Sequence, residues 1–256
     1  MKKTMTRRLL PWAITLGFFV LWQIFCMVLR IDSFILPTPI EVFQSLSTYP
    51  TAILMNALHT FFSTLVGFAL AVAFGLALGL VLGASRLMYD GVYPIMIAFN
   101  SIPKVAIVPL LIVWFGIGTI PAIITAFVIS FFPIVVNVAT GLATIEPEMQ
   151  DVMRVLGAHK MQILWKIGIP RAMPYFFASL KVAITLAFIG SIVAETVASN
   201  FGIGYLMMEA SARFDVPLVF AGLFVIAAMG VIMYELFAFL ERYVTFWAVR
   251  SNEVVT

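Results

Sequence analysis

Ionisable side chains within apolar stretches are the residues of this sequence best placed to do chemistry. Glu195 and Glu235 each lie in a strongly apolar segment, and Lys104 follows Pro103 in a third. A charge in a lipid-like environment is costly, so such groups commonly serve a function or pair with a counter-charge. We expect Glu195 to line a gate or to pair with a cation. Glu235 is expected to face a helix bundle or to pair near Arg242, and Lys104 to attract an anion or to stabilise its helix.

Uncharged polar side chains in the same apolar segments form a second candidate set. Asn100 and Ser101 precede Lys104, and Asn137 lies in the following segment. Together with Lys104 and Glu195, these residues are candidates for the lining of a translocation path or gate. Amides and hydroxyls of membrane helices also form hydrogen bonds between helices, so a packing role is the alternative.

The sequence carries no signature of a catalytic site. It contains no GxxxxGK[ST] loop, the usual cradle for nucleotide phosphates, so we expect no ATP hydrolysis by this chain itself. Its two histidines, His59 and His159, are far apart and accompany neither an HExxH motif nor a cysteine cluster. We therefore predict that this chain has no catalytic residue, no metal site and no cofactor of its own.

The composition indicates which elements must position these residues. Hydrophobic residues make up 63% of the 256-residue chain, charged residues make up 11%, and the mean hydropathy is +1.10. These values are unlike those of soluble domains. We predict an all-α polytopic membrane protein with about six transmembrane helices, at Leu9–Leu29, Leu58–Ala84, Val92–Phe115, Ile120–Leu142, Pro174–Ala194 and Leu218–Leu240. The third span is expected to be bent or discontinuous because it contains Pro94, Pro103 and Pro109.

Basic residues predict the orientation of these helices. The first apolar segment is too long for a signal peptide and has no small-residue cleavage site, so we expect it to be retained as a helix. The positive-inside rule then favours two cytoplasmic termini. The basic residues assigned to the cytoplasm are Lys2, Lys3, Arg7, Arg8, Arg86, Arg154, Lys160, Lys166, Arg171, Arg242 and Arg250, against Arg30 and Arg213 outside. The net charge of +3 is explained by these loops, and no nucleic-acid partner is expected.

The chain divides into three parts. Residues 1–57 comprise a cytoplasmic tail, the first transmembrane helix and an external amphipathic segment, in which Thr38 and Glu41 are expected to form a capping box. Residues 58–245 form the membrane domain and include a polar cytoplasmic loop at 146–170. Residues 246–256 form a second cytoplasmic tail.

Small residues recur every four positions in the second span. A helix with such a stripe lets another helix approach closely. We expect tight packing within the chain, with a contact between subunits as the alternative. The stripe consists of Gly67, Ala71, Gly75, Gly79 and Gly83.

The loop at 146–170 interrupts the apolar pattern and predicts a helix–turn–helix. Pro147 suits a first helical turn, and Glu148 and Asp151 place negative charge near the positive end of the helix dipole. Gly157 permits a sharp turn, and a second short apolar set follows and ends before Pro170. Such a hairpin either docks on another protein or lies against lipid headgroups.

The same loop resembles that of the permease subunits of binding-protein-dependent ABC importers. In that family the loop reads Glu-Ala-Ala, three residues, Gly, nine residues, then Ile-x-Leu-Pro. The matching frame here is Asp151, Val152 and Met153, then Gly157, then Ile167 to Pro170. The nitrate, sulfonate and taurine group of these permeases is further resembled by Ile102-Pro103-Lys104-Val105-Ala106, Trp114-Phe115-Gly116-Ile117-Gly118, Ala194-Glu195 and Gly202-Ile203-Gly204-Tyr205-Leu206.

This resemblance implies a type-1 ABC-importer permease fold in a bacterial-type cytoplasmic (inner) membrane. It also implies two ATP-binding cassette ATPase subunits that use ATP, a second permease subunit, most simply as a homodimer, and an external solute-binding protein. The solute would be a sulfonate, nitrate, taurine or a thiamine-pyrimidine precursor. Asp151, Val152, Met153, Gly157, Ile167 and Pro170 would couple the ATPase to the membrane domain. A gradient-driven secondary transporter is the alternative, motivated by Glu195 and Glu235, and a membrane enzyme ranks last.

Overall fold

A computed structural model describes the backbone of residues 2–249 and the side chains of residues 10–247, apart from Arg86, Pro147 and Ala198. The predicted cytoplasmic side chains of Lys2, Lys3, Arg7, Arg8, Arg86 and Arg250, and the tail beyond Val249, lie outside the described residues. The regular elements of the described chain are all helical. They are α1 (Lys2–Val28), α2 (Pro39–Thr48), α3 (Pro50–Ala84), α4 (Arg86–Ser101), η1 (Lys104–Ile107), α5 (Val108–Phe115), α6 (Thr119–Ala143), α7 (Pro147–Val155), α8 (Lys160–Ile163), η2 (Leu164–Gly168), α9 (Ile169–Ala198), α10 (Ile203–Ala212), α11 (Val216–Val244) and α12 (Phe246–Val249).

Five helices of the described chain are long and apolar enough to cross a membrane, and the number is six if a bent pair of helices is counted as one span. The bent pair joins α4 to the segment Lys104–Phe115 at an angle of 77°. The break falls at Pro103, whereas Pro94 lies inside α4 and Pro109 lies in the first turn of α5. A first-turn proline needs no intrahelical N–H, so it is tolerated where an interior proline would break the ladder. The described chain thus has five to six candidate spans, in agreement with the expected six or so, and the expected break in the third one is present.

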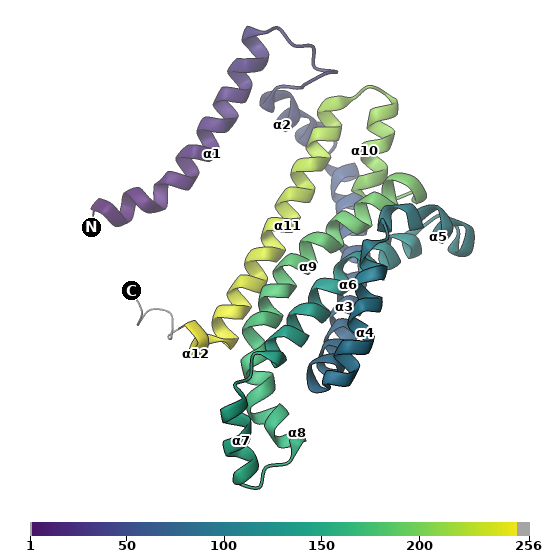
Figure 1. The fold of residues 1–256 in the computed structure, drawn as a ribbon. Helices are drawn as coiled ribbons and strands as arrows, with labels where there is room; N and C mark the ends of the chain where they lie inside the picture. Colours follow the sequence, from purple (N-terminus) through teal and green to yellow (C-terminus); the bar gives the residue numbers. More distant parts are fainter. Residues whose placement is uncertain (1, 250–256) are drawn as a thin grey trace.

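The core of the bundle lies where α6 packs between α3 and α9 (Figure 1). The small-residue stripe of α3 makes this contact possible. A Cβ added at Gly75 would lie 2.9 Å from the Cβ of Ile134, and one at Gly79 would lie 2.7 Å from that of Val138, both on α6. The stripe therefore packs within the chain, because any larger residue would push the two backbones apart.

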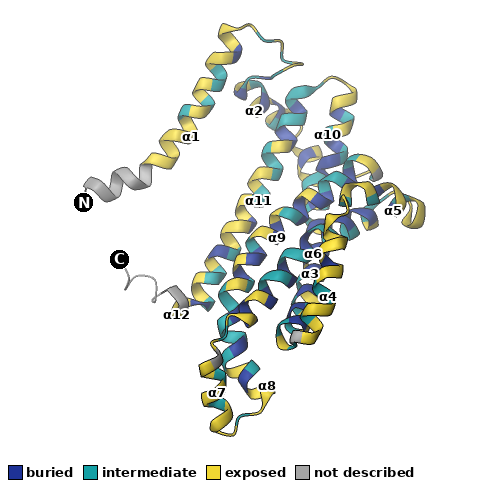
Figure 2. Ribbon diagram, viewed as in Figure 1, coloured by how far each residue is buried: buried dark blue, intermediate teal, exposed yellow. Residues whose placement is uncertain are grey.

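The helix α1 stands apart from the bundle along most of its length (Figure 1). Its apolar side chains are largely exposed (Figure 2), and aromatic contacts join Phe19 and Trp22 to Phe224 of α11. After α1 the chain enters α2 through the predicted capping box. The Glu41 amide donates to Thr38 Oγ1 at 3.3 Å, and the Thr38 amide donates to Glu41 Oε2 at 2.7 Å.

Candidate functional site: the helical hairpin between α6 and α9

A short helical hairpin, α7 and α8, projects beyond one end of the membrane bundle (Figure 1). The turn between the two helices is set by Gly157, whose φ is +81°. The Ala158 amide donates to the Met153 carbonyl and the Gly157 amide donates to the Arg154 carbonyl, each at 2.9 Å. This pair of bonds is a Schellman motif. The motif requires a residue in the left-handed backbone conformation, which glycine adopts without a steric penalty.

The hairpin presents apolar side chains to its surroundings. Val155 is 88% exposed, Leu156 is 76% exposed and Val152 is 59% exposed. All three lie on α7 or at its end, beside the charged pair Asp151 and Arg154, whose atoms Oδ1 and Nη1 are 2.7 Å apart. An apolar patch rimmed by polar residues is typical of a contact surface for another protein or for a membrane.

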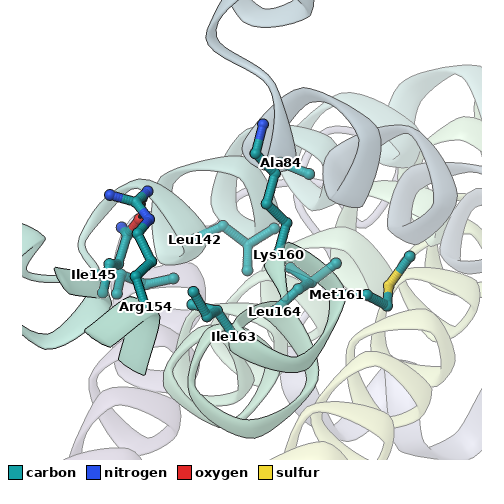
Figure 3. Close-up of a pocket in the computed structure, with 10 residues that line it drawn as sticks. Ala84, Leu142, Ile145, Arg154, Lys160, Met161, Ile163 and Leu164 are labelled. Carbon is teal, nitrogen blue, oxygen red and sulfur yellow. Dashed lines mark hydrogen bonds between the residues drawn. The ribbon is translucent and has the colours of Figure 1, made fainter. Parts of the chain in front are cut away.

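The base of the hairpin is joined to three membrane helices. Arg171 of α9 donates to Glu146 Oε1 at 3.1 Å and to the Thr144 carbonyl, at the end of α6, at 3.3 Å. A cavity of about 330 Å³ lies behind the hairpin (Figure 3). It is lined by Gly83 and Ala84 at the end of α3, by Leu142, Ile145 and Gln150, and by Arg154, Lys160, Met161, Ile163 and Leu164 of the hairpin. The hairpin therefore meets the membrane bundle at the ends of α3, α6 and α9.

The second half of the loop has a different structure from the one that the sequence predicts. We expected a separate short helix ending before Pro170 and a membrane span beginning at Pro174. Instead, α8 continues through the π-helical turn η2 into α9, so one continuous helix runs from Lys160 to Val197 and contains the expected span. Pro170 lies in the first turn of α9, where its missing N–H is tolerated next to the wider π turn. Ile167 and Pro170 thus lie at the root of a continuous helix, and Met153 and Gly157 lie in the projecting part.

The proposed path residues Ser101, Lys104 and Asn137 each form a hydrogen bond to the residue four positions earlier in the sequence. Lys104 Nζ donates to the Asn100 carbonyl at 2.6 Å and to Asn100 Oδ1, so it caps the C-terminal end of α4. Ser101 Oγ donates to the Ile97 carbonyl at 2.9 Å. Asn137 Nδ2 donates to the Pro133 carbonyl at 2.8 Å. Ser101 and Asn137 therefore bond within their own helices and not between helices, and the place of these residues on a solute path stays a prediction.

Only part of that set shares a cavity. Asn100 and Lys104 line one of about 290 Å³, together with phenylalanine rings of α4 and α6. Asn137 and Glu195 do not line it. The tertiary structure thus separates residues that the sequence grouped by polarity alone.

Glu195 is buried, with 3% of its surface exposed, and it lies at the end of α9. Thr60 donates to its Oε2 at 2.7 Å, the Gly204 amide donates to the same oxygen at 3.1 Å, and Ser63 donates to Oε1 at 3.2 Å. No cation of the described chain pairs with it. The expected pairing with a cation is therefore not met in the described chain, and the expected place at a gate stays a prediction. The polar spacing of Thr60 and Ser63 in an apolar helix was the signal that could have identified its partners.

Glu235 is exposed on α11, and within the described chain it forms no ion pair with Arg242. It follows the buried Met233 by two positions, about 200° around the helix, which places it on the opposite side. The carboxylate that pairs is Glu241, whose Oε2 lies 2.6 Å from Lys181 Nζ, with both side chains about four-fifths buried. The expectation for Glu235 was wrong because its position two residues after Met233 turns its side chain away from the buried face of α11.

Comparisons with known proteins agree with this architecture. The family model described as "Binding-protein-dependent transport system inner membrane component" matches residues 71–246. The chain is 32% identical to a "Probable ABC transporter permease protein" of Haemophilus influenzae, over 89% of this chain and 93% of that protein. It is 28% identical to the "Formylaminopyrimidine transport permease protein ThiX" of Halalkalibacterium halodurans, over 89% and 91%. It is 29% identical to the "Nitrate import permease protein NrtB" of a Synechocystis species, over 88% and 85%.

Among solved structures, the chain is similar to one from the inward-facing MetNI methionine ABC transporter, with a TM-score of 0.66. The similarity covers 74% of this chain and 94% of that chain at 21% identity, so it supports the fold alone. The expected all-α type-1 permease fold is confirmed. The chain belongs to the family of binding-protein-dependent transport system inner membrane components, and it is the membrane-spanning permease of an importer of this kind.

Proposed function

We propose that this permease takes its energy from ATP hydrolysed by two separate ATPase subunits, which dock on the α7–α8 hairpin. The observation that carries the proposal is the exposed apolar surface of Val152, Val155 and Leu156 at the end of the bundle. Such a surface is costly in water and is stabilised when a partner's groove covers it. A second permease subunit, most simply another copy of this chain, and an external solute-binding protein complete the proposed assembly.

The proposed orientation places the hairpin and both termini in the cytoplasm of a bacterial cell. It is supported by the basic residues Arg154, Lys160 and Lys166 at the hairpin end of the bundle, where α12 also lies (Figure 1). Arg30 and Arg213 follow α1 and α10, near the opposite end. Basic residues are enriched on the cytoplasmic side of membrane proteins, so the charge distribution favours this orientation.

The proposed solute is a small molecule of the sulfonate, nitrate, taurine or thiamine-pyrimidine-precursor class. Support comes from relatives that are named for nitrate and for formylaminopyrimidine. In this proposal the binding protein selects the solute and the permease supplies the path. Uptake of labelled nitrate, taurine and formylaminopyrimidine into liposomes that contain the complete importer distinguishes the classes.

The docking proposal is tested with a charge placed on the hairpin. Val155→Asp puts a carboxylate into the apolar surface, and we expect it to abolish co-purification of the ATPase and ATP-driven uptake. Leu87→Asp is the matched control, because Leu87 is 83% exposed but lies in the first turn of α4, where a carboxylate is favourable. Equal losses in both variants, or retained binding in Val155→Asp, would contradict docking at the hairpin.

A further inference from the structure

A polar corner joins α3, the end of α9 and the start of α10. The first three amides of the α10 segment each have a side-chain acceptor from another helix. The Gly202 amide donates to Asn56 Oδ1 at 2.8 Å, and the Ile203 amide donates to Thr60 Oγ1 at 2.8 Å. The Gly204 amide donates to Glu195 Oε2 at 3.1 Å. The N-terminal amides of a helix have no intrahelical partner, so these three contacts satisfy groups that would otherwise be left unpaired.

The polar side chains that α3 contributes to this corner lie on one face of that helix. Asn56, Thr60 and Ser63 are spaced by four and three residues, which places them one above another toward α10. Thr60 has a central position, because its oxygen accepts from the Ile203 amide while its hydroxyl donates to Glu195. Both Thr60 and Ser63 are buried. The centre of the corner is therefore shielded from water, whereas Asn56 at its edge is partly exposed.

Two glycines allow the backbone to approach this carboxyl group. Gly202 has a φ of +104°, a conformation that other residues rarely adopt. A Cβ at Gly204 would lie 2.6 Å from the Ile192 carbonyl and 2.7 Å from the Glu195 Cβ. The Gly-x-Gly spacing that follows Glu195 in the sequence is thus explained by direct contact between the two segments.

The hydrogen bonds around position 195 do not require a negative charge there. Ser63 Oγ lies 3.1 Å from the Thr60 carbonyl as well as 3.2 Å from Glu195 Oε1. When Ser63 donates to that carbonyl, its oxygen accepts a hydrogen from residue 195. A neutral amide side chain meets the same geometry, because its oxygen accepts from Thr60 and Gly204 and its NH2 group donates to Ser63.

We propose that this corner is a latch that holds α10 rigidly on α3 and α9, and that Glu195 is a positioning residue acting through hydrogen bonds. This latch proposal rests on the proposed function only for the orientation, which places α10 at the external mouth of the path. In this role Glu195 does not contact the solute. It keeps the external α10 segment fixed while the opposite end of the bundle responds to the ATPase.

The test compares four variants of the full-length chain in lipid nanodiscs by hydrogen exchange of the amides at 202–204. Glu195→Leu and Thr60→Val remove acceptors, and we expect exchange to rise by roughly tenfold or more. Glu195→Gln is expected to stay within about threefold of the parent chain. The matched control is Ser191→Ala, one turn earlier on α9, because the buried Ser191 hydroxyl has no hydrogen-bond partner in the described chain. It should leave the exchange unchanged.

Uptake by the complete importer separates the latch from a charged gate. We expect Glu195→Gln to retain uptake within about threefold, and Thr60→Val to lose it together with amide protection. Loss of uptake in Glu195→Gln with unchanged exchange would overturn the proposal, because the charge itself would then be required. Unchanged exchange in both Thr60→Val and Glu195→Leu would overturn it as well. If Glu195→Leu fails to insert, Thr60→Val decides. The exchange measurement uses neither the ATPase nor a binding protein, so it stands if the proposed function fails.

Discussion

The turn at Gly157 allows the coupling role of the hairpin to be tested with a small perturbation. A Cβ built at this position has no neighbour within 4 Å, so a substitution meets no steric obstacle from the rest of the chain. The cost is confined to the backbone, which has a φ of +81°. A residue with a Cβ pays about 1–2 kcal/mol in this left-handed conformation. That cost shifts the balance between the native turn and other turns by a factor of about 5–30.

Gly157→Val and Gly157→Asn form a matched pair for this position. Valine is β-branched and strongly disfavours the left-handed conformation, whereas asparagine adopts it several-fold more readily than other residues. We expect Gly157→Val to insert normally but to lower solute uptake per ATP hydrolysed by about 5–30-fold. Gly157→Asn is expected to recover most of the coupling.

The assay measures uptake and ATP hydrolysis together in liposomes that contain the complete importer. Insertion is checked by the yield of folded protein after detergent extraction. Parental coupling in Gly157→Val would refute the reasoning, because the strained turn would then be irrelevant to coupling. Equal damage from valine and asparagine would refute it too, because φ would not be the property that matters.

Three further predictions concern packing, ion pairing and pH. Gly79→Ala should lower the free energy of unfolding in detergent by about 1–3 kcal/mol, because the added methyl group overpacks against α6. Gly91→Ala should not lower it, because a Cβ at Gly91 meets no neighbour within 4 Å. Lys181→Met and Glu241→Gln should each destabilise by about 1–3 kcal/mol, and a double-mutant cycle should show that the combined loss is smaller than the sum. Burial alone would raise the pKa of Glu41, but hydrogen bonds from Ser33 and Thr38 outweigh it and lower the pKa below 4.5. The stabilisation of α2 should therefore be complete above pH 4.5 and be lost as the pH falls through the lower folded-state pKa, measured by amide exchange at the start of α2.

Local patterns explain why much of the fold could be predicted. Apolar length identified the membrane spans, and the capping box at the start of α2 depends on residues three positions apart. Pro103 ended α4 as expected because proline cannot supply the N–H that a continuing helix needs. Gly157 marked the turn because glycine favours a left-handed backbone. Each of these features is decided by neighbours within a few residues.

The hydropathy and spacing of the sequence by themselves determined a membrane bundle with a projecting hairpin, because hydrophobic length and helix-terminus chemistry are local properties. The partners of individual polar groups were decided only by the tertiary structure. Glu195 meets Thr60 across 135 residues of sequence, and Glu241 rather than Glu235 meets Lys181. The physical reason is that a buried polar group is stable only where packing brings a partner within hydrogen-bond distance, and that packing depends on how the helices are rotated against one another.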